Sequence, residues 1–257
     1  MSLLDAFRLD GQIAVVTGAG KGIGRAIALG LAQAGADVAI GARTASDLEK
    51  VAAEIRALGR RALAIPTDAT SKAALEHLAQ KTTEELGPIG IWVSNAGGIP
   101  DGTPRYLTRT SEESWDAQIS LNLKAVWMGA VVAAKSMHEA GGVIINISSR
   151  AAMGPQAKNG PYGAAKAGVN SLTGTLAHEL APKIRVNAVG PGPIPTENFD
   201  DCMGTDSEEK REQLRSMMRI PLQRFGKEDD IAAAVLFLAS PAAGWVTGQC
   251  LYVTGGL

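Results

Sequence analysis

The sequence predicts an α/β fold: a doubly wound parallel β-sheet of about seven strands with helices on both faces. Short β-rich apolar segments alternate with longer helical patterns along the chain. The strand segments are continuously apolar, which indicates burial on both faces and therefore a parallel sheet between helices. A glycine-rich turn after the first strand fits the same architecture. With 257 residues, 46% of them hydrophobic, the chain can bury one sizeable core, so we expect a single domain over 1–257.

The predicted elements follow in order along the chain. Runs of four to eight apolar, β-favouring residues predict the strands, in chain order at 13–18, 37–42, 62–68, 89–96, 143–149, 184–189 and 251–254. Longer periodic patterns predict the helices, at about 22–34, 46–58, 71–86, 111–139, 161–181 and 228–239. Parallel strands require long crossovers of this kind, so the alternation and the sheet type agree.

One segment departs from this alternation. Between Pro191 and Pro221 the chain is rich in Pro, Asp, Glu and Met, with a short helix predicted at 207–218. Such a long excursion in a compact α/β domain is usually functional. We therefore predict a substrate lid at about 193–220.

Charge and composition favour a small-molecule enzyme. The net charge is −1 and no basic run occurs, so neither nucleic acid nor a membrane is an expected partner. The N-terminus has no signal-peptide pattern and no segment is apolar enough to span a bilayer, so we expect a cytoplasmic protein. Cys202 and Cys250 are predicted to be free thiols. His77, His138 and His178 begin no metal-binding pattern, so no metal is expected.

A tyrosine and a lysine stand four residues apart, at Tyr162 and Lys166, in a segment predicted to be helical. Residues at i and i+4 are neighbours on one helix face. An ammonium there would lower the pKa of the phenol from its ordinary value of ~10 towards neutrality, where a general acid or base works best. An amphipathic helix surface with a lysine whose charge reaches solvent is the alternative.

The turn after the first strand reads Thr17-Gly18-Ala19-Gly20-Lys21-Gly22-Ile23-Gly24 and leads into a helix. Glycines let the backbone approach a pyrophosphate, and the helix N-terminus offers free N–H groups to it. The spacing is T-G-x-x-x-G-x-G rather than G-x-G-x-x-G. At a first strand–helix junction it predicts a dinucleotide-binding fold of the Rossmann type. The binding residues would be Gly18, Gly20, Lys21, Gly22, Ile23 and Gly24.

Further motifs occur in one order along the chain. They are Asn95-Ala96-Gly97, Asn122, Ser149, Tyr162-x-x-x-Lys166 and Pro191-Gly192, after the glycine turn. In this order and spacing they resemble the classical short-chain dehydrogenases/reductases, and the resemblance covers nearly the whole chain. Ser94 departs from it, because the family commonly has a second asparagine before Asn95. That change affects a hydrogen bond beside the sheet and no catalytic role.

Carbonyl reduction requires a hydride source, a proton donor and a group that holds the oxygen. From chemistry alone Ser148 and Ser149 both qualify for the last role. The resemblance implies Ser149, because the family's serine precedes its tyrosine by thirteen positions. It also implies that Tyr162 donates the proton and that Lys166 tunes it. Asn122 would kink its helix and support a water of the proton relay.

The resemblance also implies the remaining cofactor contacts. Tyr162 and Lys166 would contact the cofactor as well as the substrate, together with Asn95, Ala96, Gly97, Pro191, Gly192, Ile194 and Thr196. In the family the segment after the sixth strand anchors the nicotinamide, so Ile194 backbone groups and Thr196 would hold its carboxamide and phosphates. A rigid proline turn would explain the same residues.

The residues after the second strand bear on which dinucleotide is used. An NAD-preferring site usually ends this strand with Asp or Glu, which holds the ribose 2′-OH. Here Ala42 stands at that position, Arg43 follows, and Lys21 adds a second cation. We therefore expect NADP(H) to be preferred, with NAD(H) as the alternative. Asp68, with Ala69 beside it, resembles the family's adenine-contacting acid; a turn-forming aspartate is the other interpretation.

The predicted activity is NADP(H)-dependent interconversion of a ketone and a secondary alcohol. A non-catalytic dinucleotide-binding regulator is the alternative from another class, and the intact Ser149, Tyr162 and Lys166 set disfavours it. Within the family, a 3-oxoacyl thioester or hydroxysteroid specialist stays open. Enoyl reductases usually space their tyrosine and lysine differently, and epimerases need a larger C-terminal part. The resemblance implies a homotetramer, or a homodimer, with the helices at 111–139 and 161–181 pairing across a twofold axis.

Overall fold

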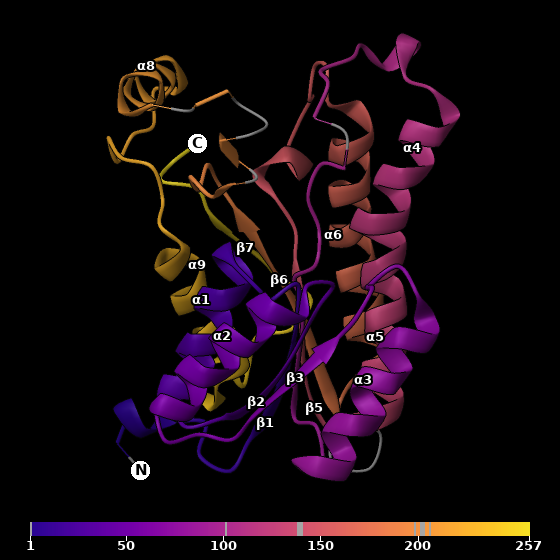
Figure 1. Ribbon diagram of the computed structural model, residues 1–257, viewed down its shortest axis with the longest axis vertical. Coiled ribbons are helices and arrows are strands. Elements are labelled where there is room, and N and C mark those ends of the chain that lie inside the picture. The colour runs from indigo at the N-terminus through magenta and orange to yellow at the C-terminus, as the bar shows by residue number, and fades with distance from the viewer. Residues whose placement is uncertain (1, 101, 138–140, 198, 201–203, 206) are drawn as a thin grey trace.

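A computed structural model describes residues 2–257 except 101, 138–140, 198, 201–203 and 206. Its centre is a seven-stranded sheet in which every pairing is parallel and the order is β3-β2-β1-β4-β5-β6-β7 (Figure 1). The strands are β1 (Ile13–Thr17), β2 (Asp37–Ala42), β3 (Ala62–Pro66), β4 (Ile91–Ser94), β5 (Gly142–Ile147), β6 (Ile184–Pro191) and β7 (Cys250–Val253). The predicted doubly wound α/β fold is confirmed.

Helices cover both faces of the sheet (Figure 1). One side carries α1 (Gly22–Gln33), α2 (Ala45–Ala57) and α9 (Glu228–Ala239), and the other carries α3 (Lys72–Glu85), α4 (Glu112–Ile119), α5 (Ala125–Met137) and α6 (Gly160–Leu180). Alternate residues of each strand point to opposite faces. In β1, Ala14 and Val16 accordingly join one core cluster and Val15 joins the other. This burial on both faces explains why the strands read as continuously apolar.

The helix predicted at 111–139 is interrupted. It consists of α4, a π-helical turn η3 (Ser120–Lys124) and α5; residues 138 and 139 lie outside the described part of the chain. A single insertion of this kind is rare within an α-helix and is frequent at functional sites. Asn122, 0% exposed, lies in the π turn. The expected asparagine-centred irregularity is therefore present, although periodicity alone predicted one regular helix.

The helical stretch Glu112–Met137 is long and apolar enough to cross a membrane, judged by length and composition alone. Half of its most apolar window is buried inside the protein, and α5 packs against α3, α6 and the sheet. Its apolar residues therefore serve the core of the domain, although the sequence expectation was that no segment is apolar enough to span a bilayer.

Several strands end one or two residues earlier than predicted, and β4 and β5 are the two that matter for the site. β4 ends at Ser94 rather than at residue 96, and β5 ends at Ile147 rather than at residue 149. Asn95 and Ser149 therefore lie in the connections that leave the carboxyl edge of the sheet, where open α/β sheets bind ligands. β6 in contrast continues to Pro191, two residues further than predicted.

The segment predicted to be a lid follows β6 and contains α8 (Glu208–Met218), which stands apart from the sheet (Figure 1). The Ser207 hydroxyl accepts a hydrogen bond from the backbone N–H of Lys210 and caps this helix. Arg211 forms an ion pair with Asp200, and the Phe199 and Phe225 rings meet edge to face at 5.8 Å. No residue of α8 is buried. Cys202 and Met203 lie outside the described residues.

Candidate active site

The ends of β1 and β4 are joined by Thr17 and Asn95. The Thr17 hydroxyl accepts hydrogen bonds from the backbone N–H groups of Asn95 and Ala96, at 3.1 and 3.2 Å. The Asn95 side chain donates to the carbonyls of Thr17 and Gly18, both at 3.0 Å. β1 is the strand at which the strand order reverses direction, and a crevice forms at such a point. Asn95 thus fixes one wall of the crevice.

The glycine turn leaves no room for side chains. Gly18 has φ +67°, a left-handed conformation that favours glycine. A Cβ added to Gly24 would lie 2.2 Å from the Gly18 carbonyl oxygen and 2.5 Å from the Asn95 amide nitrogen. α1 begins at Gly22, so its first N–H groups and the positive end of its dipole face the turn. The turn therefore fits a dinucleotide pyrophosphate, while Ile23 packs against the core.

The two candidate serines have different surroundings. Ser148 is 2% exposed, and its hydroxyl donates to the carbonyl of Lys166 at 3.3 Å. Ser149 is partly exposed and begins the short helix η4 (Arg150–Ala152), where its hydroxyl accepts from the N–H of Ala151 at 3.1 Å. Ser148 is therefore buried against α6, whereas Ser149 is partly exposed in the connection after β5.

Tyr162 and Lys166 lie on one side of the first turns of α6. The Lys166 ammonium is 5.7 Å from the centroid of the Tyr162 ring and donates a hydrogen bond to the carbonyl of Ile147 at 2.8 Å. Its residue is 3% exposed, and burial lowers the pKa of Lys166 to about 8. At neutral pH Lys166 is thus still largely protonated, but it is far closer to losing its proton than a lysine on a helix surface. The interpretation as a solvent-reaching surface lysine is wrong.

Asn122 is held by four hydrogen bonds. Its side chain accepts from the N–H of Gly98 at 3.0 Å and donates to the Gly98 carbonyl at 2.8 Å. It also donates to the backbone and side-chain oxygens of Gln118, at 3.2 and 3.0 Å. A Cβ added to Gly97 would lie 3.1 Å from the Asn122 oxygen and 3.3 Å from the Lys166 nitrogen. The π turn, the loop after β4 and α6 therefore meet at Gly97.

The segment after β6 reaches the glycine turn from the other side. Gly192 donates from its N–H to Val253 at 2.9 Å, and a Cβ on Gly192 would lie 2.7 Å from the Thr254 Cα. Ile194 is buried, and its carbonyl accepts from the N–H of Thr196. A Cβ on Gly22 would lie 3.3 Å from the Thr196 methyl group. Pro191 thus ends β6, and the segment that follows it lies beside the glycine turn.

The residues predicted to select the dinucleotide lie at the carboxyl edge near β2 and β3. Arg43 is exposed directly after β2. The Thr70 N–H and hydroxyl donate to the Asp68 carboxylate and lower the pKa of Asp68, and the charge of Arg43 adds to this effect. Asp68 is thus the turn-forming aspartate that was the other interpretation, and it also lies near Arg43. Ala69 packs into the core.

Two acidic residues lie beside the glycine turn that no sequence motif placed there. Glu197, at the start of the segment predicted to be a lid, forms an ion pair with Lys21 of the glycine turn. The Cβ of Asp47 in α2 would be 3.2 Å from a Cβ on Gly20. Lys21 and Glu197 are 176 residues apart in the chain, so the sequence alone could not pair them. Both acids add negative charge beside the position where Arg43 and Lys21 would meet a phosphate.

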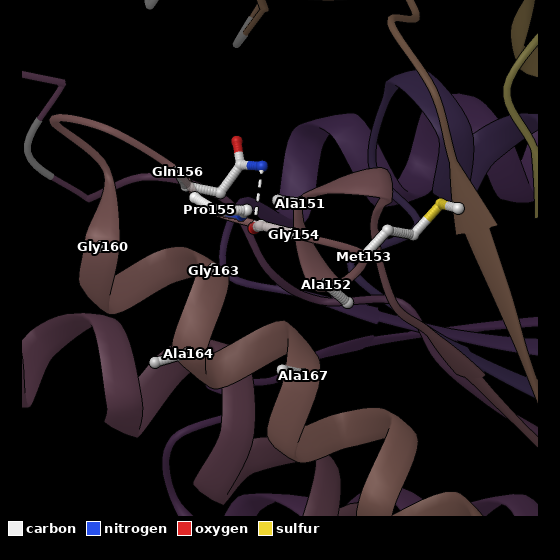
Figure 2. Close-up of a pocket in the computed structure, with 10 residues that line it drawn as sticks. All are labelled: Ala151, Ala152, Met153, Gly154, Pro155, Gln156, Gly160, Gly163, Ala164 and Ala167. Atoms are coloured by element: carbon white, nitrogen blue, oxygen red, sulfur yellow. Dashed lines mark hydrogen bonds between the residues drawn. The ribbon is translucent and has the colours of Figure 1, made fainter. Parts of the chain in front are cut away.

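A cavity of about 350 Å³ lies between the η4 connection and α6, with Gln156 and Gly160 at one end (Figure 2). Its α6 wall is made by Gly163, Ala164 and Ala167. At about 100° per residue on a helix, Gly163 points about 100° away from Tyr162 and Ala167 about 100° away from Lys166, while Ala164 points to the opposite side of the helix. The cavity therefore neighbours the crevice without including it. Among the residues described, no group of three or more His, Cys, Asp or Glu side chains is placed to hold a metal ion.

Known proteins match this chain from end to end. A sequence profile described as enoyl-(acyl carrier protein) reductase matches residues 18–257. A 3-oxoacyl-[acyl-carrier-protein] reductase of Thermotoga maritima is 36% identical over 97% of this chain and 99% of its own length. A 7α-hydroxysteroid dehydrogenase, solved with NADH and 7-oxo glycochenodeoxycholic acid, has a TM-score of 0.90 at 38% identity, covering 100% of this chain and 98% of that one.

A gluconate 5-dehydrogenase from Burkholderia cenocepacia, solved with NADP and tartrate, has a TM-score of 0.90 at 33% identity, with 100% of this chain and 98% of that one covered. Fold, glycine turn and these matches together define an NAD(P)-dependent oxidoreductase that acts on CH–OH or C=O groups. The chain belongs to the short-chain dehydrogenase/reductase family, as its motifs predict.

Proposed function

We propose that this enzyme interconverts a ketone and a secondary alcohol with NADP(H), and that Tyr162 is the general acid and base. The observation that supports this most directly is the convergence of three segments. Ser149 follows β5, Tyr162 and Lys166 open α6, and Asn122 ties the π turn to Gly98 after β4. The glycine turn that fits a dinucleotide lies at the same edge of the sheet.

Each side chain has a distinct task in this mechanism. The Tyr162 hydroxyl gives its proton to the carbonyl oxygen during reduction and takes it back during oxidation. The Ser149 hydroxyl holds that oxygen in place. The Lys166 ammonium, protonated at neutral pH with a pKa of about 8, stabilises the Tyr162 phenolate electrostatically. The nicotinamide, when bound, supplies or accepts the hydride. Asn122 keeps the loop after β4 against Lys166.

NADP(H) is the proposed cofactor because an NAD-preferring site would carry an acid at the end of β2, whereas here that acid is missing and positive charge lies beside its position. Ala42 ends β2 and exposed Arg43 follows it, with Lys21 in the glycine turn. A guanidinium suits a 2′-phosphate well. Asp47 and Glu197 work against this preference, so NAD(H) is expected to bind as the weaker alternative.

Substrate class and assembly follow from the surroundings of the site. Relatives named for 3-oxoacyl thioesters and for a hydroxysteroid make these the first two specialisations to test. The lid over 193–220 would cover the substrate, and its Phe199 and Met217 suit a partly apolar ketone.

Trp115 and Trp127 are 39% and 45% exposed on α4 and α5, which supports burial in a homotetramer or homodimer. A cytoplasmic location fits such a soluble enzyme.

The test is a panel of cyclic ketones, steroids and 3-oxoacyl thioesters, followed as NADPH consumption in wild type and in Tyr162→Phe. The variant should bind NADPH normally and turn over at least about a hundredfold more slowly, the low end of what a positioned acid contributes. Near wild-type turnover would remove the role of Tyr162. Cofactor binding without turnover of any ketone or alcohol would favour the non-catalytic regulator.

A further inference from the structure

Arginines without an ion-pair partner gather at the ligand-binding edge. Arg43, Arg109, Arg150 and Arg219 form no ion pair with any carboxylate of the described residues. Each lies in the connection after a strand, following β2, β4, β5 and β6 respectively. Carboxyl ends of parallel strands share one edge of the sheet, so the connections that carry these cations leave the sheet on the side of the crevice. Such a field attracts anions.

Two cations are assembled on one aromatic ring at this edge. Tyr106 is 55% exposed, the Arg109 guanidinium lies 6.0 Å from its ring centroid, and the Lys158 ammonium lies 5.6 Å from it. Neither cation has a carboxylate partner in the described part of the chain. We call Tyr106, Arg109 and Lys158 the cation clamp. Two like charges on one ring repel each other, and an anion that contacts both would offset the repulsion.

The cation clamp is attached to the start of α6. The backbone N–H of Arg105 donates to the Lys158 carbonyl at 3.1 Å, and Leu107 packs against Gly160. Lys158 precedes Tyr162 by four residues, and Gly163 donates from its N–H to the Asn159 carbonyl. Lys158 therefore lies in the connection that leads directly into α6, four residues before the proposed acid.

The backbone at Lys158 is strained. Its φ is +65°, a left-handed conformation that glycine or asparagine adopts at lower cost than lysine. Strain kept beside a functional site suggests a use for the side chain that causes it. A cation at this position is the feature that neither glycine nor asparagine would supply.

We propose that the substrate carries an anionic group, a carboxylate or a phosphate, at the end remote from the reacting carbon, and that Arg109 and Lys158 bind it. The proposal rests on the carbonyl chemistry assigned above and adds the charge of the substrate to it. Arg109 would form paired hydrogen bonds to the oxyanion, and Lys158 would add a point charge from the opposite loop. Tyr106 holds both cations in place.

The test compares matched ketones in the full enzyme: a keto carboxylate, its methyl ester, and the corresponding phosphate monoester. For each, kcat/KM and the Kd of the enzyme–NADP⁺ complex for the matching alcohol are measured. Wild type should prefer an anionic form over the ester by roughly tenfold or more, since a hydrogen bond to a charged group contributes that much. The preference should fall as salt is raised. Whichever of the carboxylate and the phosphate has the higher kcat/KM and the lower Kd is the anion that the site prefers.

Variants then locate the preference. In Arg109→Gln with Lys158→Gln the ratio of anion to ester should fall towards one, mainly through KM, with NADPH affinity unchanged. Lys158→Asn removes the charge while easing the backbone strain. If this variant loses the preference for the anion over the ester but is as stable as wild type or more so, misfolding is excluded as the cause. Lys158→Arg should keep the ratio, and exposed Lys135→Gln on α5 serves as the control.

The proposal would be overturned if wild type had equal kcat/KM for the ester and the anionic ketones. It would also be overturned if the Arg109 and Lys158 variants lost kcat/KM for the ester and for the anions by the same factor. These outcomes differ from failure of the carbonyl chemistry, in which no ketone turns over with either cofactor. In that event the alcohol Kd values still decide whether the clamp binds an anion.

Discussion

The Lys166 ammonium donates a hydrogen bond to the backbone carbonyl of Ile147, at 2.8 Å, inside the protein. The residue is 3% exposed, and its pKa falls to about 8 because burial disfavours the charged form. α6 thus holds a cation where the fold would be more stable without one. This is how a functional site departs from what stability alone would select.

Lys166→Met should therefore stabilise the protein while removing catalysis. The lowered pKa corresponds to a cost of up to on the order of 3 kcal/mol at pH 7, and loss of the bond to Ile147 offsets part of it. We expect a gain of about 1–2 kcal/mol in the free energy of unfolding. Denaturant titration at pH 7 measures it.

The lowered pKa of Lys166 also determines how the stability difference between wild type and Lys166→Met changes with pH. Between pH 8 and the ordinary lysine value of 10.5, the unfolded chain binds the Lys166 proton more tightly than the folded one. Wild-type stability should therefore rise with pH across this interval relative to Lys166→Met, and the gap between the two should close by its upper end. A gap that stays constant from pH 7 to 10.5 would contradict the buried, cationic Lys166.

Gly24→Ala should destroy dinucleotide binding, because its Cβ would lie 2.2 Å from the Gly18 carbonyl oxygen. Either the turn or α1 must shift, and the pyrophosphate site shifts with it. Gly30→Ala in the same helix is the matched control, with its Cβ at an ordinary 3.4 Å from Ala232. The control should bind NADPH normally and gain up to about 1 kcal/mol in stability. Similar NADPH affinities in the two variants, measured by fluorescence titration, would refute the expectation.

Asn122→Leu should cost about 2 kcal/mol or more, since it keeps the branching of the side chain but leaves the N–H and carbonyl of Gly98 without their partner. The loop after β4 should then move away from Lys166 and lower kcat. Ser120→Ala in the same π turn removes no hydrogen bond of the loop and should change stability by less than about 0.5 kcal/mol. Thermal unfolding and steady-state rates test both, and equal effects would mean that Asn122 does not anchor the loop.

Arg43→Ala should weaken NADPH binding roughly tenfold or more and leave NADH binding nearly unchanged, because only NADPH carries a 2′-phosphate. Glu197→Gln should act in the opposite direction, since it releases Lys21 from its ion pair. That effect should be a few-fold at most, because the pair is solvent-exposed. Kd values for both nucleotides decide, with Arg56→Ala on α2 as the control. A parallel loss of NADPH and NADH binding would assign Arg43 a structural role instead.

Patterns local in the chain were sufficient to predict the alternation of strands and helices and to place Tyr162 and Lys166 on one side of α6. A helix or strand is set by periodicity over a few residues, and those periods are written in the sequence. Local periodicity could not predict the π turn at Asn122, because hydrogen bonds to Gly98 in a different loop hold it. The ends of β4 and β5 were likewise misjudged, since the strand ladder stops where tertiary contacts take the chain away.

By itself the sequence determined the α/β class, the glycine turn and the identity of the residues that can carry the chemistry. Only the tertiary structure decided that Ser148 is buried while Ser149 is partly exposed, that Lys166 is buried with a pKa of about 8, and that Glu197 meets Lys21. The physical reason is the range of the interactions. Backbone propensity and turn chemistry act between near neighbours in the chain, whereas burial, desolvation and ion pairing depend on which distant segments the packed sheet brings together.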